Sequence, residues 1–210
     1  MRVVILGRTK MGQGVCVGGM VEDTGRPVRL LPRGTYCHPP HTPFQVGQVW
    51  DLDLRPRNSI EPPHTEDHDE WNGRLVGHHD DLLPFLRRWV KKPWMGGPET
   101  LFDGTLRVRK SGTAYLPRHG PQPVRSVGFW VLPAALIFLP REGDRRFLLQ
   151  HTRPIFKIPY VGTAPPPTHI PKGTLVRVSL ARWWLNPNHA DEGETCALQL
   201  SGWYPRPTAS

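Results

Sequence analysis

The chain has 210 residues, of which 25 are Pro and 21 are Gly, and its 27 Lys and Arg outnumber its 18 Asp and Glu. This much proline excludes a protein of long helices, because proline removes a backbone donor and clashes inside a helix. The three cysteines are too few and too irregularly spaced for a disulfide framework. The net charge of +9 favours a polyanionic partner, although a basic surface kept for solubility also accounts for it.

The apolar segments are too short to enter a membrane. The longest, residues 127–139, falls short of the roughly 20 residues that a membrane helix needs, and Pro133 interrupts it. The N-terminal run 2–7 is too short for the apolar region of a secretory signal. We therefore expect a cytoplasmic protein without a membrane partner.

Short strands are predicted in the first 60 residues. Apolar runs at 2–7, 15–20 and 28–31 indicate buried strands, and alternation over 47–54 predicts a fourth. Residues 7–14 contain three glycines with Arg8 and Lys10, and we expect a turn there whose amides and cations can approach a phosphate. An ordinary hairpin connection explains this segment almost as well.

The middle of the chain contains the one helix candidate. Residues 56–72 are expected to form an extended connector, and apolar residues recur at helical spacing over 80–91. Asp80 is expected to cap this helix, Pro84 to lie in its first turn and Pro93 to end it.

Strand patterns return after Gly104 and extend to the C-terminal region. The predicted strands are 106–108, 127–132, 136–139, 147–150, 174–180 and 196–200. The whole pattern predicts a mostly β protein of two small barrel-like units. We expect the first unit at 1–60, a connector with a helix near 80–92 at 61–103, and the second unit at 104–204.

Basic residues gather in the second half of the chain, where aromatic residues interleave with them. Between residues 104 and 190 there are thirteen Lys and Arg but only two acids, Glu142 and Asp144. Single-stranded nucleic acid binders use this mixture, because cations follow the phosphates and rings stack on unpaired bases. The expected contacts are Arg8, Lys10, Arg107, Arg109, Lys110, Arg145, Arg146, Arg153 and Lys157 for phosphates, with Tyr160 and Trp183 for bases.

Not every aromatic residue of this span is expected at the surface. Half of the side chains on alternating strands point inward, so Phe129 and Phe147 are assigned to the core. Phe156 and Tyr160 are expected to be more available, because they lie in a predicted loop flanked by prolines.

Catalytic and metal-binding patterns are weak in this sequence. The loop 37–41 (CHPPH) mixes soft and imidazole ligands but lacks a compact set of four, and Cys37 has no group that orients it as a nucleophile. Glu66 and Asp67 can form a metal-dependent nuclease cluster only with a further carboxylate that no strand motif supplies. We expect no cofactor, no metal and no enzymatic activity, with this nuclease as the enzyme alternative.

Three stretches of the chain resemble a known family. They are residues 3–31, which begin VVILGRT and end DTGRPVRLL, residues 43–67, with PFQVGQVWDL before PPHTED, and residues 196–204, CALQLSGWY. Together they resemble the bacterial dual OB-containing domain family over essentially the whole chain. The resemblance implies two OB-like β-barrels and a nucleic-acid-binding or sensing module, often in bacterial defence or on mobile elements. It implies no catalytic residues.

The resemblance leaves more than one function open, because OB barrels also bind oligosaccharides and proteins. The leading hypothesis is binding of single-stranded or structured DNA or RNA. The alternative is a protein-interaction adaptor for a separate nuclease or helicase, in which the aromatic residues would be interface anchors.

Overall fold

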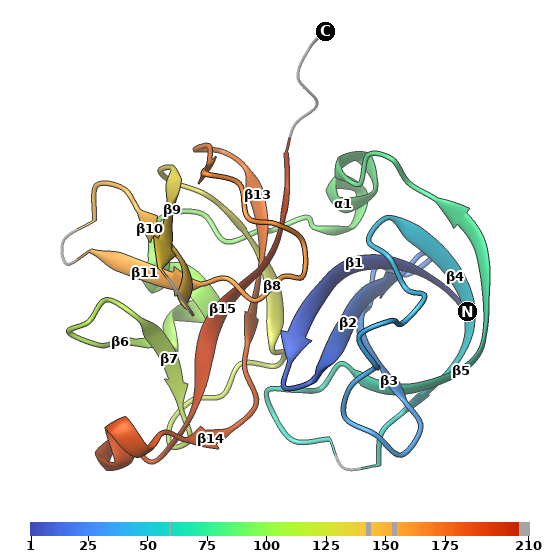
Figure 1. The fold of residues 1–210 in the computed structure, drawn as a ribbon, viewed down its shortest axis with the longest axis horizontal. Helices are drawn as coiled ribbons and strands as arrows, with labels where there is room; N and C mark the ends of the chain where they lie inside the picture. Colours follow the sequence, from blue (N-terminus) through green and yellow to red (C-terminus); the bar gives the residue numbers. More distant parts are fainter. Residues whose placement is uncertain (59, 142–143, 153–154, 206–210) are drawn as a thin grey trace, which may run out of the picture.

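The computed structural model describes residues 1–58, 60–141, 144–152 and 155–205. Figure 1 shows two β units that meet along a central seam, the N-terminal unit from blue to green and the C-terminal unit from light green to red. The mostly β fold predicted from the sequence is confirmed. No helix in the described ranges is long and apolar enough to cross a membrane.

The N-terminal unit is a closed five-stranded barrel. Its strands are β1 (Arg2–Met11), β2 (Gly14–Val21), β3 (Pro27–Pro32), β4 (Gln48–Pro56) and β5 (Asp67–His78). They close in the order β1-β2-β3-β5-β4, with β3 parallel to β5 and the other neighbours antiparallel. A five-stranded barrel is the architecture of the OB-fold. Alternate residues point inward, so Val3, Ile5, Val15, Val17 and Leu30 form its core.

Two predictions for this barrel are wrong in detail. The segment 7–14 is not a turn, because β1 continues to Met11 and β2 begins at Gly14. Only Gly12 and Gln13 turn, with Gly12 at φ +55°, so Arg8 and Lys10 stand on a strand. The expected connector 56–72 contains the start of β5, which the pattern did not predict because the strand is exposed after Glu70.

The connecting region carries α1 (Leu83–Trp89) and the 3-10 segment η1 (Pro98–Gly104). The helix is shorter than predicted, and Asp80 does not cap it: Asp81 accepts the Leu83 amide at 2.8 Å, whereas Asp80 contacts His78. Pro84 lies in the first turn, as expected. Buried side chains of α1 pack against both β units, in a cluster with Val4, Leu6, Met20, Phe129 and Tyr204.

The C-terminal unit consists of two sheets around one core. Its elements are β6 (Arg107–Val108), β7 (Ala114–Pro117), β8 (Val127–Val131), β9 (Leu136–Arg141), β10 (Asp144–Leu149), β11 (Phe156–Pro159), β12 (His169–Ile170), β13 (Leu175–Leu180), β14 (Trp184–Leu185), the 3-10 segment η2 (Pro187–Glu192) and β15 (Glu194–Tyr204). One sheet has the order β11-β10-β9-β12 and the other β6-β7-β15-β13-β8, with β14 beside β15. The shared core contains Trp130 and Phe147, and Phe129 is buried at the seam, so the prediction for both phenylalanines is confirmed.

The loop predicted around Phe156 and Tyr160 is instead a strand. Residues 156–159 form β11, which pairs with β10 over four residues. Both aromatic side chains consequently point into the core, with 3% of Phe156 and 4% of Tyr160 exposed. Pro159 is the last residue of this strand, where a missing backbone donor costs little.

The two units are joined by backbone hydrogen bonds along β1. The Lys10 amide donates to the Val161 carbonyl at 2.8 Å, and the Thr163 amide donates to the Arg8 carbonyl at 3.0 Å. Residues 161–163 therefore continue the N-terminal barrel at its β1 edge. The strand β5, which completes the first barrel, lies beyond residue 60. The domain boundaries expected from the sequence as a whole stay a prediction.

Candidate nucleic-acid interface

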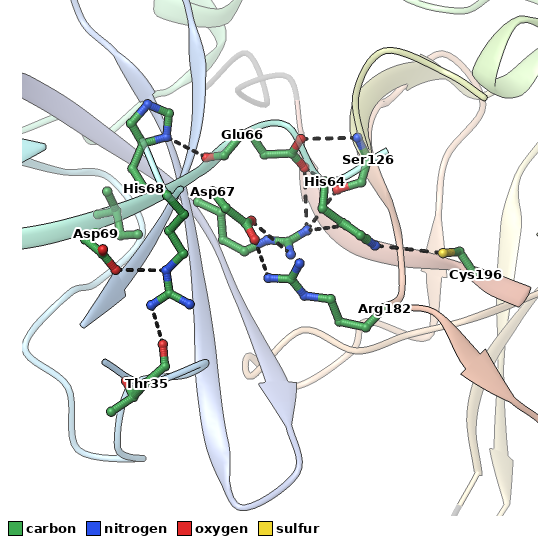
Figure 2. A network of polar contacts seen from close by, with 12 residues as sticks. Thr35, His64, Glu66, Asp67, His68, Asp69, Ser126, Arg182 and Cys196 are labelled. Carbon is green, nitrogen blue, oxygen red and sulfur yellow. Dashed lines mark hydrogen bonds and ion pairs between the residues drawn. The ribbon is translucent and has the colours of Figure 1, made fainter. Parts of the chain in front are cut away.

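A buried polar network crosses the seam beside β3. Arg29 is 6% exposed, pairs with Asp67 at 3.2 Å and donates to the Ser126 hydroxyl of the second unit at 2.8 Å. Glu66 accepts from the Ser126 amide and hydroxyl, and Figure 2 shows these groups converging between the barrels. The network holds β3 and the start of β5 against the loop before β8.

Two further side chains complete this network. Arg182 of the second unit donates to Asp67 Oδ2, whereas Arg29 contacts Oδ1 (Figure 2). His64 lies 3.3 Å from Arg29, and burial together with the charges of Arg29 and Arg182 lowers the pKa of His64 to about 2. Because a guanidinium can only donate, the His64 Nδ1 accepts and the ring is neutral.

His64 also contacts a buried thiol. The Cys196 sulfur lies 3.8 Å from the His64 Nε2, and burial raises the pKa of Cys196 to about 12. The pair is therefore a neutral thiol beside a neutral imidazole. A nucleophilic cysteine needs the thiolate, so this contact stabilises the seam and does not activate a nucleophile.

The carboxylates of the nuclease alternative lie in this same network. Glu66 and Asp67 are 3% and 4% exposed. The Arg29 guanidinium contacts both carboxylates, and the Ser126 hydroxyl donates to Glu66. No group of three His, Cys, Asp or Glu that could hold a metal ion occurs among the described residues. His38, in the loop considered for metal binding, contacts the Leu30 carbonyl at 3.0 Å. The geometry gives the nuclease alternative no support.

Next to this network the seam opens into a hollow of about 350 Å³, which we call the inter-barrel groove. Four cationic side chains line it, Lys10 and Arg29 from the first barrel and Arg177 and Arg182 from the second unit. Trp184 also lines the groove and is 58% exposed. Cations from strands far apart in the sequence thus converge on one hollow.

A second hollow of about 560 Å³ adjoins the inter-barrel groove, because Met11 and Arg182 line both. Two aromatic residues line it, the half-buried Trp183 and Tyr36, which is 71% exposed. The Trp183 indole donates to the Pro62 carbonyl at 2.9 Å and carries the Arg118 guanidinium 4.7 Å above its ring. The first hollow thus contributes the cations and Trp184, and the second contributes Trp183 and Tyr36 beside Arg182 and Glu61.

Arg177 differs from the other cations of the groove. It is 7% exposed and donates to the Ser201 hydroxyl at 2.8 Å, and no ion pair joins it to a carboxylate in the described part of the chain. Gly7 and Gly18 lie under its guanidinium: a Cβ at Gly18 would be 2.3 Å from the Arg177 Nη2. The missing side chains of β1 and β2 make the room that this arginine occupies.

The cations predicted from the sequence fall in several places. Lys10 lies in the inter-barrel groove, whereas Arg8 lies nearby with Gln45 and the Pro40 carbonyl as partners. Arg107 and Lys110 are exposed around the β6–β7 hairpin, at the left edge of Figure 1. This hairpin lies beside β11, because the Lys157 amide donates to the Gly112 carbonyl at 2.8 Å.

Other predicted contacts have internal partners. Arg109 forms a bidentate pair with Glu192, which lowers the pKa of that carboxyl, and lies 4.1 Å above the Tyr115 ring. Arg145 donates to the carbonyls of Gly162 and Ala164, and covers the Tyr160 ring at 4.6 Å.

Three predicted residues remain to be placed. Tyr160 is a core residue with almost no surface to offer a base. Arg146 is half-buried on β10, and Arg153 lies outside the described residues.

Sequence reasoning missed four groove residues, Arg29, Arg177, Arg182 and Trp184. Arg29 and Arg177 each interrupt an apolar strand, PVRLLP and LVRVSL. A single arginine within an apolar strand marks a side chain that needs a buried polar partner or an opening to solvent. That pattern was available in the sequence, but the approach of the two strands to one hollow across the seam was not.

The model of one protein family, described as the dual OB-containing domain, matches residues 1–203. The chain belongs to this family. The resemblance noted from the sequence is therefore confirmed, and the β1-β2-β3-β5-β4 barrel of this dual OB-containing protein agrees with it. Neither a curated protein nor a solved structure shows a significant match to the chain. OB-folds commonly bind oligonucleotides, and this is the coarse functional expectation that the family carries.

Proposed function

We propose that this dual OB-containing protein binds single-stranded or structured nucleic acid in the inter-barrel groove. One observation carries the proposal: Lys10, Arg29, Arg177 and Arg182 meet the exposed Trp184 around a single hollow. Cations neutralise phosphates and release counterions, while an exposed ring stacks on an unpaired base for about 1–3 kcal/mol.

The adjoining hollow extends this surface. Tyr36 and Trp183 supply two more rings, and Arg182 is shared by both hollows. A strand that lies along the seam could therefore contact the cations of the first hollow and the rings of both. Base-paired nucleic acid hides the faces of its bases inside the stack, so this arrangement favours unpaired nucleotides.

The β6–β7 hairpin is a further candidate contact for the same ligand. Arg107 and Lys110 are exposed there, and neither forms an ion pair within the described ranges. We include both residues as peripheral phosphate contacts.

We further propose that the protein binds without cleaving, and that it acts in bacterial defence or on mobile elements. The absence of cleavage rests on the engagement of Glu66 and Asp67 by arginines. The biological context rests on the family resemblance alone. An adaptor function, with a separate nuclease or helicase as partner, is the outcome to consider if the isolated protein binds no nucleic acid.

The test is fluorescence anisotropy with labelled single-stranded DNA, duplex DNA and RNA of equal length, each titrated at several salt concentrations. We expect the single strands to bind best, with log affinity falling linearly in log salt. Lys10→Glu and Trp184→Ala should each lower affinity by about tenfold. Absence of binding to all three ligands at low salt would overturn the proposal.

The matched controls lie elsewhere on the molecule. Lys172→Glu changes an exposed lysine outside the groove, and Trp71→Ala removes an exposed indole on β5. Both should bind as the wild type does. If the controls lose as much affinity as the groove variants, binding is a property of the overall charge and the groove is not the site. Strand cleavage by the wild type in Mg²⁺ or Mn²⁺ would restore the nuclease alternative.

A further inference from the structure

We propose that the inner part of the inter-barrel groove is a pocket for a terminal phosphate monoester, with Arg177 as its principal cation. The inference rests on the proposed function, because it assigns a specific chemical group of the nucleic acid to part of that site. It also makes a separate claim: an end of a strand, and not only its backbone, is recognised.

The first argument is the state of Arg177. Burying a guanidinium without a counter-charge is costly, and buried arginines are normally paired. Only 7% of Arg177 is exposed, and this residue lines the groove. Among the described residues, its guanidinium donates to the Ser201 hydroxyl, which carries no charge. A bound anion would supply the missing counter-charge.

A second donor in the same groove lacks a partner. The Arg182 Nε is buried and makes no hydrogen bond within the described residues, although the Nη2 of the same side chain donates to Asp67. Asp67 thereby holds this guanidinium in place with one donor unused. Since this nitrogen is itself buried, a ligand would meet the rest of the Arg182 side chain, which lines the groove together with Arg177.

The charge balance selects a monoester over a diester. Lys10, Arg29, Arg177 and Arg182 line the groove, and the carboxylates that contact them are Glu66 and Asp67. Four cations and two carboxylates leave an excess of two positive charges. A phosphate monoester carries about −1.5 to −2 at pH 7, whereas each backbone diester carries one negative charge.

The surroundings of the guanidinium suit a small, compact anion. Gly18 leaves the Arg177 Nη2 packed directly on the β2 backbone, so the arginine is held at the bottom of the seam. Ser179 and Gln199 line the groove from β13 and β15 and add neutral polar groups. Trp184 lies on the same wall, where the first base of a bound strand can stack.

The test compares three forms of one oligonucleotide sequence. One form carries a 5′-phosphate, one carries a 3′-phosphate, and the third has a hydroxyl at both ends. We expect the wild-type protein to bind one of the phosphorylated forms about tenfold or more tightly than the hydroxyl form. A difference of this size is what one charge-assisted hydrogen bond contributes. The two phosphorylated forms show which end is read. Arg177→Gln should abolish the preference, because it lowers the affinity for the phosphorylated strand more than that for the hydroxyl strand, while Arg177→Lys should retain part of the preference.

A second measurement needs no variant and covers the case in which Arg177→Gln does not fold. Thymidine monophosphate should raise the melting temperature of the wild-type protein, and thymidine at the same concentration should not. Stabilisation by the monophosphate without strand binding would support the pocket and overturn the proposed function.

The remaining outcomes separate the two claims. Strands that bind equally well whatever their ends, with no effect of the monophosphate, would overturn the pocket and leave the proposed function standing. No strand binding and no stabilisation would overturn both.

Discussion

The hydroxyl of Tyr204 donates a 2.6 Å hydrogen bond to the carbonyl oxygen of Leu6, 198 residues earlier in the chain. The bond joins β15, the last strand of the second unit, to β1, the first strand of the barrel. Burial raises the pKa of the Tyr204 phenol, so the hydroxyl keeps its proton and remains a donor. The two units are thus tied together by the first and last strands of the chain as well as by the Arg29 network.

Tyr204→Phe should destabilise the protein by about 1–2 kcal/mol, because the Leu6 carbonyl loses a buried donor. The ring itself remains in the cluster with Phe129, so packing is preserved. Urea unfolding measures the change. Tyr36→Phe, at an exposed tyrosine, is the control and should leave the free energy of unfolding unchanged. Equal stability of Tyr204→Phe and wild type would mean that water replaces the hydroxyl.

Stability should fall as the pH drops from 7 to 5. The folded protein keeps His64 neutral because its pKa is lowered to about 2, while the unfolded chain takes up a proton near pH 6.5. Protons therefore favour the unfolded state, and His64 accounts for a loss of about 2 kcal/mol at pH 5. The pKa values of His38 and His68 are also lowered by burial, which adds to the loss.

His64→Gln isolates this effect in unfolding experiments at pH 7 and pH 5. Glutamine can accept from Arg29 without titrating, so the variant should lose less stability than wild type over this interval. An identical pH dependence in the two proteins would show that His64 is solvated and free to protonate.

Gly18→Ala should destabilise the seam by about 1–3 kcal/mol, because its Cβ would lie 2.3 Å from the Arg177 guanidinium. Gly77→Ala on β5 is the control, since the nearest neighbour of its Cβ would be Val49 at an ordinary 3.7 Å. Thermal unfolding compares the two. A Gly18→Ala protein as stable as wild type would mean that Arg177 moves aside without cost.

Asp67→Asn should cost about 3–5 kcal/mol, because Arg29 and Arg182 then lose the carboxylate with which both form ion pairs. Asp23→Asn, at an exposed turn, is the control. Chemical denaturation gives both values. A small effect at Asp67 would indicate that Glu66 and solvent compensate the two arginines.

Arg107→Ala combined with Lys110→Ala tests the peripheral contacts at the β6–β7 hairpin. If both side chains bind phosphates, affinity should fall for all sequences and the salt slope should decrease by about one unit for each lost contact. Arg109 is left intact, because its pairing with Glu192 would confound the result. An unchanged slope would remove the hairpin from the binding surface.

The sequence by itself determined the kind of fold and its charge. Proline content excluded long helices, and short apolar runs with one alternating segment predicted four strands of the first barrel. Inward-facing positions identified Phe129 and Phe147 as buried. These features are local, because the spacing of apolar residues and the residue types of turns act over only a few positions of the chain. The family resemblance rested on the same strand and turn segments.

The tertiary structure decided which charged residues share a site. Arg29 of β3 and Arg177 of β13 are distant in sequence, and they line one hollow only because the two units pack together along the seam, where Arg177 lies against Gly18 of β2. The structure also buried Tyr160 and paired Arg109 and Arg145 internally, although each resembled a surface contact in the sequence. Composition counts charges but cannot say which have partners, since pairing and desolvation depend on contacts between remote segments.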